Sequence, residues 1–261
     1  MIARVLMLAV LLAVPRLALG ATAPDLSGLA YEQRPGAQIP LAALLRDEEG
    51  REVRLSDLMA GKPLILTLIY FRCPNICGVV RADLFAALAA SGMIPGRDYT
   101  LVALSIDPTE TPADASDVRA GVLQRHSVAG AVPHWHFLTG SYEALRAIKD
   151  AVGFHDRFDP DLKQIIHPVG VVFATPAGVV SSYVLGVGYE PADLRLGTTR
   201  AAQGTVASAA MPVLLLCFNY DPATGRYTLA ILKLLRLFAG LTVATIGVTL
   251  YLAFRRERIR E

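Results

Sequence analysis

Two of the three cysteines in the sequence, Cys73 and Cys77, stand four residues apart directly after an apolar run. Residues 63–70 have the continuous apolarity of a strand buried on both faces, and residues 78–90 carry apolar side chains at helical spacing. With Pro74 as the first helical residue, both sulfurs fall on one helix face and can meet one ligand. Thiols at a helix N-terminus have a lowered pKa, which favours the thiolate that binds metal or attacks disulfides. A structural disulfide, or two unreactive core cysteines, is the alternative.

A pair with the spacing Cys-x-x-x-Cys does not by itself separate metal binding from redox chemistry, so a third ligand would decide. His167 is the best candidate, because it comes just before residues 169–174, which we expect to form a strand beside strand 63–70. In the fold that the order of strands and helices predicts below, the loop before that strand faces the cysteines and often holds a cis-proline; the sequence does not say whether Pro168 is cis. Two thiolates and one imidazole suit Cu(I), and with an added weak ligand they can hold Cu(II). Zinc is the rival, but structural zinc sites want four protein ligands and no fourth is obvious.

The other cysteine and the other histidines carry weaker signals. Cys217 lies in an apolar run, as a small buried hydrophobic residue would. His134 and His136 would share one face of a strand, which we interpret as a solvated face. His126 ends an expected helix, where a cation suits the helix dipole, and His155 lies in a polar loop.

Strand and helix patterns alternate around these residues. Thr111, Pro112 and Asp114 have the types and spacing of an N-cap, a first helical residue and a capping box. Strand 63–70, helix 78–90 and the next strand form a βαβ unit, whose two strands are parallel. The expected strands are 41–45, 51–55, 63–70, 99–106, 135–138, 169–174 and 179–184, and the expected helices are 78–90, 112–125, 142–152 and 191–203. This order predicts an α/β fold, a thioredoxin-like domain over residues 40–203.

Both ends of the chain predict export and membrane anchoring. Residues 1–20 combine Arg4, an apolar core and a small-residue cleavage site, as in a secretory signal peptide. The uncharged stretch from Leu237 to Phe254 is long enough to cross a membrane, and the arginines after it hold the C-terminus in the cytoplasm. The expected segments around the domain are a lead-in at 21–39, a loop and extra hairpin at 204–230, a transmembrane helix at 231–254 and a cytoplasmic tail at 255–261. We therefore expect a single-pass protein of the bacterial inner membrane, with its domain on the periplasmic side.

The net charge argues neither for nor against a nucleic acid partner, whereas the lack of a basic patch argues against one, and the expected export of the chain constrains the cysteines. The formal net charge is +2, and no basic patch interleaved with aromatic residues occurs between the two ends, so we expect no nucleic acid partner. In an oxidising compartment a cysteine pair stays reduced only if something keeps it so or a metal occupies it.

Four ordered segments of the sequence resemble the Sco/SenC copper proteins, and together they span most of residues 40–190. They are Tyr70 to Cys77 after Gly61-Lys62-Pro63; Ser105-Ile106-Asp107-Pro108 followed by Thr111-Pro112; Trp135-His136-Phe137-Leu138-Thr139-Gly140; and His167 before a strand. The chain departs from many relatives at Gly78, where they have proline, and in its C-terminal anchor, where theirs is N-terminal. It also has Ile166 and Pro168 around His167 in place of Asp and Ser. No neighbouring carboxylate is therefore supplied to bond the second imidazole nitrogen.

The resemblance implies copper binding by Cys73, Cys77 and His167, and a role in assembling the binuclear copper centre of cytochrome c oxidase. The leading hypothesis is a membrane-anchored copper chaperone, not an enzyme in the strict sense. It would hand Cu(I) or Cu(II) to the copper-bearing subunit of the oxidase or to another cuproprotein. The alternative is a thiol-disulfide oxidoreductase in which Cys73 and Cys77 reduce the cysteines of a cuproprotein. A peroxiredoxin-like peroxidase ranks last, because Cys73 lacks a Thr-x-x-Cys context.

Overall fold

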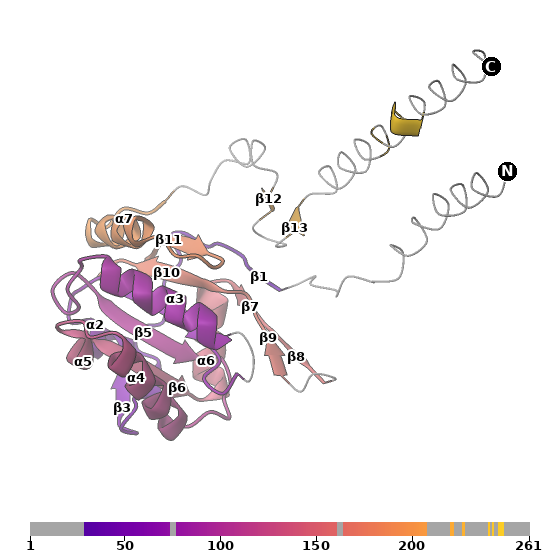
Figure 1. Ribbon diagram of the computed structural model, residues 1–261. Helices are drawn as coiled ribbons and strands as arrows, with labels where there is room; N and C mark the ends of the chain where they lie inside the picture. Colours follow the sequence, from indigo (N-terminus) through magenta and orange to yellow (C-terminus); the bar gives the residue numbers. More distant parts are fainter. Residues whose placement is uncertain are drawn as a thin grey trace, which may run out of the picture.

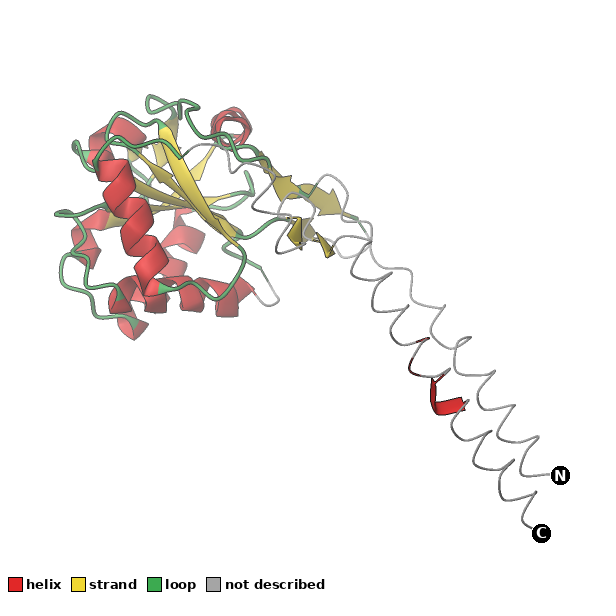
Figure 2. Cartoon of the chain, turned by 90° about the horizontal axis from the view of Figure 1, so that it is seen from above, coloured by secondary structure: helices red, strands yellow, loops and turns green. Residues whose placement is uncertain are grey.

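The strand that leads to the cysteines, β4 (Leu64–Ile69), lies inside a seven-stranded sheet of order β11-β10-β4-β5-β6-β2-β3 (Figure 1). This computed structural model describes residues 29–73, 77–160 and 164–207, together with residues 220–221, 226–227, 240, 242 and 245–247. Helices cover both faces of the sheet (Figure 2). The result is a three-layered α/β arrangement of the thioredoxin-like kind.

The elements have the following bounds. The other sheet strands are β2 (Leu44–Arg46), β3 (Glu52–Arg54), β5 (Thr100–Ser105), β6 (Trp135–Gly140), β10 (Gly170–Ala174) and β11 (Val180–Leu185). The helices are α2 (Leu55–Met59), α3 (Cys77–Ala90), α4 (Pro112–Arg125), α5 (Ala131–His134), α6 (Tyr142–Ala151) and α7 (Pro191–Ala202). Three short antiparallel pairs lie outside the main sheet: β1 (Ala30–Tyr31) with β7 (Phe154–His155), β8 (Arg157–Asp159) with β9 (Gln164–Ile166), and β12 (Tyr220–Asp221) with β13 (Arg226–Tyr227).

The strand register brings three loops to one edge of the sheet. Strands β4 and β5 are parallel with Ile69 opposite Ser105, so the segments after them start side by side. Strand β10 runs antiparallel to β4 with Val171 opposite Thr67, so the segment that precedes β10 reaches the same edge. The carboxyl ends of parallel strands are the usual position of a site in an α/β sheet.

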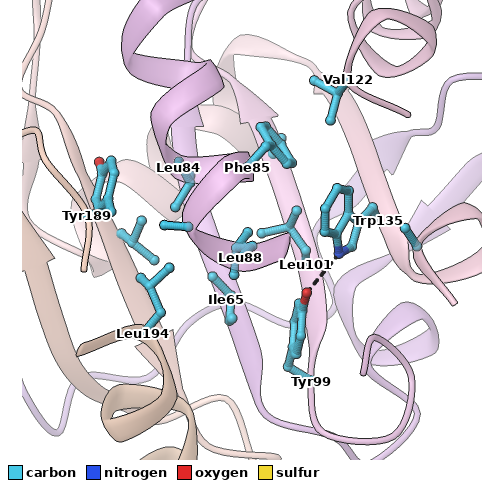
Figure 3. Packing of buried hydrophobic residues seen from close by; sticks show 14 of the residues in the cluster. Ile65, Leu84, Phe85, Leu88, Tyr99, Leu101, Val122, Trp135, Tyr189 and Leu194 are labelled. Carbon is cyan, nitrogen blue, oxygen red and sulfur yellow. Dashed lines mark hydrogen bonds between the residues drawn. The ribbon is translucent and has the colours of Figure 1, made fainter. Parts of the chain in front are cut away.

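Alternating side chains of the central strands form a core on each face of the sheet. Ile65 packs with residues of α3 and α7 on one face, whereas Leu64 and Leu66 pack with residues of α2 and α6 on the other. Figure 3 shows the first core, in which the indole N–H of Trp135 donates a hydrogen bond of 3.0 Å to the hydroxyl of Tyr99. Burying one large apolar side chain in such a core stabilises the fold by roughly 1.5–3 kcal/mol. Strand β4 is therefore fixed from both faces.

Most of the expected elements are confirmed to within a few residues. The βαβ unit is parallel, and the hairpin of β10 and β11 lies beside β4. The capping box of α4 is present, with the Thr111 N–H donating to Asp114 at 2.7 Å. The first hairpin, β2 with β3, joins the main sheet because β2 also pairs with β6. Strands β12 and β13 form the expected second hairpin at their four described residues.

Several smaller expectations are wrong. His134 ends helix α5 rather than lying in a strand, and His136 in β6 is half-buried, so the two do not share a solvated strand face. His155 belongs to β7, which pairs with β1, instead of a polar loop. The β8–β9 hairpin was not expected, because its short strands lack a clear alternation of apolar and polar residues; it projects beyond the sheet (Figure 1).

The predicted targeting segments lie almost wholly outside the described residues. The signal peptide at 1–20 and the tail at 255–261 are not among the described residues, and neither is Cys217. Within the expected transmembrane helix, residues 240, 242 and 245–247 are described, and they are helical. No helix in the described part of the chain is long and apolar enough to cross a membrane.

Candidate metal centre

Cys73 lies in the loop between β4 and α3, where its side chain is half-buried and takes part in a disulfide bond. The other cysteines of the sequence are Cys77 and Cys217, and the side chains of both lie outside the described set. The backbone of Cys77 begins α3 as the structure has it, and residues 74–76 are not described, so the expected helical position of Pro74 stays a prediction. Because metal binding requires thiolates, the cysteine described here must first be reduced.

His167 faces the same cavity as Cys73. This cavity has a volume of about 330 Å³ and is lined mainly by apolar side chains from β4, α3 and the segment between β9 and β10. The strand register explains why His167 and Cys73 reach the same cavity, because His167 stands three residues before β10, at the edge of the sheet where β4 ends. Cys73 and His167 thus line one cavity, while their role as ligands stays a prediction. For Cys77, only the placement of its backbone at the start of α3 is described.

The imidazole of His167 is held through its Nδ1 atom. Nδ1 lies 2.9 Å from the carbonyl oxygen of Pro168, and because a carbonyl oxygen only accepts, Nδ1 carries the hydrogen. The Nε2 atom of the neutral ring then keeps its lone pair for a metal ion. The ring also lies 6.1 Å from the ring of Phe154. A backbone carbonyl therefore takes the orienting role that we had assigned to a missing carboxylate.

The surroundings of His167 keep it neutral. Burial lowers the pKa of His167, and it outweighs the opposite effects of the Pro168 carbonyl and the Asp156 charge. A neutral imidazole is the form that binds metal ions. The peptide bond before Pro168 is trans, since the described residues contain no cis peptide bond.

A buried carboxylate holds the loop that precedes Cys73. Glu110, in the segment after β5, accepts hydrogen bonds from the N–H of Phe71 at 3.1 Å and the N–H of Arg72 at 2.6 Å. The hydroxyl of Ser105 lies 2.6 Å from the same carboxylate. The side chain of Glu110 is 0% exposed, and burial raises its pKa despite these hydrogen bonds. The position of the cysteine loop thus depends on Glu110, which lies 37 residues after Cys73 in the sequence.

Arg72 ties the same two loops together from the outside. Its guanidinium lies 3.4 Å from Asp107 and donates to the hydroxyl of Thr109 at 2.6 Å. The Arg72 side chain is 47% exposed, so solvent screens its ion pairs and they add little stability. The buried hydrogen bonds of Glu110 therefore hold the two loops together more strongly than the exposed ion pairs of Arg72 do.

Tyr189 forms part of the cavity wall on the side of α7. Its backbone N–H and that of Gly188 donate to one carboxylate oxygen of Asp83 on α3, at 3.1 and 2.8 Å. Burial, together with the Asp83 charge, raises the pKa of Tyr189 well above its ordinary value, so the phenol stays neutral. The loop after β11 is therefore fixed to α3, with Tyr189 in the cavity wall.

Sequence reasoning found Cys73 and His167 but missed Glu110. The segment Thr109-Glu110-Thr111-Pro112 follows a buried strand, yet nothing in the pattern shows that its carboxylate turns back to the cysteine loop. Among the side chains described, no group of three or more His, Cys, Asp and Glu is placed to hold a metal ion, and Cys77 is not in that set. The three-ligand set Cys73, Cys77 and His167 thus stays a prediction.

A sheet with cysteines at the end of a central strand and a histidine across the cavity defines a thioredoxin-like protein with a cysteine–histidine site. The SCO1/SenC family model matches residues 35–193, and the chain belongs to that family. Among curated proteins, no sequence matches the chain.

Solved structures share the fold. The chain is similar to two candidate electron transfer or transport proteins from Aquifex aeolicus VF5. For one, the identity is 26%, the TM-score is 0.57, and the match covers 66% of this chain and 96% of that one. For the other, the identity is 28%, the TM-score is 0.53, and the match covers 66% of this chain and 99% of that one. Arabidopsis thaliana ScoI, solved with copper bound, has 20% identity and a TM-score of 0.50, covering 66% of this chain and 99% of that chain.

Proposed function

We propose that the chain is a copper chaperone whose reduced Cys73 and Cys77, with Nε2 of His167, capture copper outside the cytoplasm. The observation that carries this proposal is the cavity that Cys73 and His167 share, with Nδ1 of the imidazole already hydrogen-bonded to the Pro168 carbonyl. Membership of the SCO1/SenC family and the copper-bound relative support the choice of metal. Two soft thiolates and one imidazole fit Cu(I) by ligand type.

The site suits transfer as well as binding. Three protein ligands leave room for a donor atom from a recipient, so copper can leave by stepwise ligand exchange. His167 needs no proton transfer for this, because burial keeps the ring neutral and Nδ1 retains its hydrogen throughout. The recipient in this proposal is the copper-bearing subunit of cytochrome c oxidase or another cuproprotein. A transmembrane helix at 231–254 would keep the domain beside such a membrane partner.

A second candidate function is favoured by the disulfide of Cys73. In a thiol-disulfide oxidoreductase, one thiolate attacks a sulfur of the partner disulfide and forms a mixed disulfide, while a partner thiolate leaves. The second thiolate of the pair then attacks the mixed disulfide, so the partner gains two electrons and the cysteine pair becomes oxidised. Cys77 would be the second thiol in this reading, and His167 would have no essential part.

The variant His167→Ala separates the two functions. If the chain is a chaperone, the variant should lose copper, and Cu(II) most of all because Cu(II) prefers nitrogen ligands. The variant should then fail to restore oxidase assembly in cells lacking the chain. Its rate of disulfide reduction should stay within a few fold of wild type, because that chemistry needs only the thiols. His155→Ala is the control, since His155 lies in β7 and does not line the cavity. If His167→Ala loses copper and still supports assembly, the chaperone proposal fails and the oxidoreductase replaces it.

A further inference from the structure

Arg81 is a cation in the cavity wall beside Cys73 and His167. It lies on α3, four residues after Cys77 and therefore on the same helix face as that residue. Its side chain lines the cavity together with apolar residues such as Val80, Leu84 and Val169. A charged group in such an apolar wall is costly unless an opposite charge comes close.

Arg81 has no ion-pair or hydrogen-bond partner among the described residues, whereas Arg72 at the end of the neighbouring strand is paired with Asp107. The charges that act on it are those of Arg125 and Glu110. Burial first, and the Arg125 charge second, lower the pKa of Arg81, while the Glu110 charge raises it. The Glu110 oxygens already accept from the backbone of Phe71 and Arg72 and lie 3.8 Å from the Arg72 guanidinium. Within the described part of the chain, the cavity thus holds a positive charge without a paired anion.

We propose that Arg81 is the counter-charge of the loaded site and makes it prefer Cu(I) over Cu(II). This inference rests on the proposed function, because it takes the two thiolates and the neutral imidazole as the ligand set. Monovalent copper with two thiolates carries one net negative charge, whereas divalent copper with the same ligands carries none. In a low-dielectric cavity a cation stabilises the first state and does little for the second. Arg81 would interact electrostatically with the net negative charge of the copper complex and would not itself be a ligand.

The test compares affinities for the two copper ions in the reduced full-length protein. Arg81→Met keeps an apolar side chain of similar length and removes the charge, so it should weaken Cu(I) binding by about 10–100-fold, the usual cost of losing a residue that tunes a metal site. Cu(II) binding should change by less than about threefold, since no net charge is left to stabilise. A tenfold loss confined to Cu(I) lowers the Cu(II)/Cu(I) potential of the bound ion by about 59 mV. Arg81→Lys should restore most of the preference.

Arg119→Met is the matched control. Arg119 is also mostly buried, at 18% side-chain exposure, but it pairs with Glu48 at 2.7 Å and does not line the cavity. Its loss should lower the urea midpoint of unfolding and leave both copper affinities as in wild type. Should Arg81→Met not fold, Arg81→Gln carries the same test, because it also removes the charge.

Each outcome separates this inference from the proposed function. Equal weakening of Cu(I) and Cu(II) in Arg81→Met, or no change in either, overturns the role of Arg81 while copper binding by the wild type stands. A wild-type protein that binds neither ion after reduction overturns the proposed function, and the inference with it. Selective loss of Cu(I) in Arg81→Met, recovered in Arg81→Lys, supports both.

Discussion

The backbone N–H of Arg72 donates a 2.6 Å hydrogen bond to the carboxylate of Glu110, which lies 38 residues further along the chain. The two residues meet because β4 and β5 are parallel and end together, with Ile69 opposite Ser105. The residue just before Cys73 is thus positioned by a side chain from the neighbouring loop. Backbone geometry at the end of β4, and with it the direction of the Cys73 side chain, depends on this contact.

Glu110→Gln should weaken copper binding by about 10–100-fold, as loss of a group that orients a ligand commonly does. An amide has one accepting oxygen, so either the Phe71 N–H or the Arg72 N–H loses its acceptor, at a cost of about 1–3 kcal/mol in the free energy of unfolding. Copper competition titration and urea unfolding measure the two effects.

Glu48→Gln is the control for Glu110→Gln. Glu48 is a second buried carboxylate whose pKa is raised by burial, and it accepts from the N–H of Phe137 at 3.3 Å, away from the cavity. We expect a comparable loss of stability in this variant with unchanged copper affinity. Equal copper affinities in both variants would show that Glu110 supports the fold and not the site.

Mild acid should destabilise the domain through His136. Burial, with smaller effects of the His134 and Arg119 charges, lowers the pKa of His136 from 6.5 to about 4. Between these values the unfolded chain binds more protons than the folded one, so the free energy of unfolding falls as the pH falls. The loss should be on the order of 2–3 kcal/mol between pH 7 and 4.

His136→Gln isolates that contribution. Urea unfolding at several pH values should show a smaller decrease in stability on acidification for this variant than for wild type, whatever its stability at pH 7. A variant with the wild-type pH dependence would mean that other groups, and not His136, account for the acid sensitivity.

Membrane topology can be tested at the C-terminus. Four arginines follow Phe254, so a reporter fused after Glu261 should be active only if it is a type that works in the cytoplasm. Activity of a periplasmic type of reporter after Glu261 would contradict both the orientation and the export of the domain.

The fold could be read from the sequence because its strongest signals are local. Strand β4 is a continuous apolar run, α4 begins with a complete capping box, and β10 and β11 flank a turn with Pro176 and Gly178. These patterns also placed His167 just before a strand beside β4, and hence near Cys73. The expected strand order was enough to predict that Cys73 and His167 lie near each other, because the register of a sheet fixes which loops share an edge.

The parts that the sequence did not reveal depend on contacts between distant residues. Whether Glu110 turns inward to Arg72 or outward to solvent is decided by tertiary packing, and both are compatible with a polar loop. The same holds for the Pro168 carbonyl, whose direction at His167 no residue type encodes. His136 misled us because alternation in a short strand predicts exposure only when one face of the sheet is free, and here helices cover both faces.

Copper content of the purified, reduced, full-length chain decides the site. Wild type and Cys217→Ser should each carry one copper ion per chain, whereas Cys73→Ser and Cys77→Ser should carry almost none, because soft thiolates dominate the proposed ligand set. Equal loss in all three cysteine variants would place Cys217 in the site and contradict the assignment. Copper retained by Cys73→Ser and Cys77→Ser alike would contradict the copper site altogether.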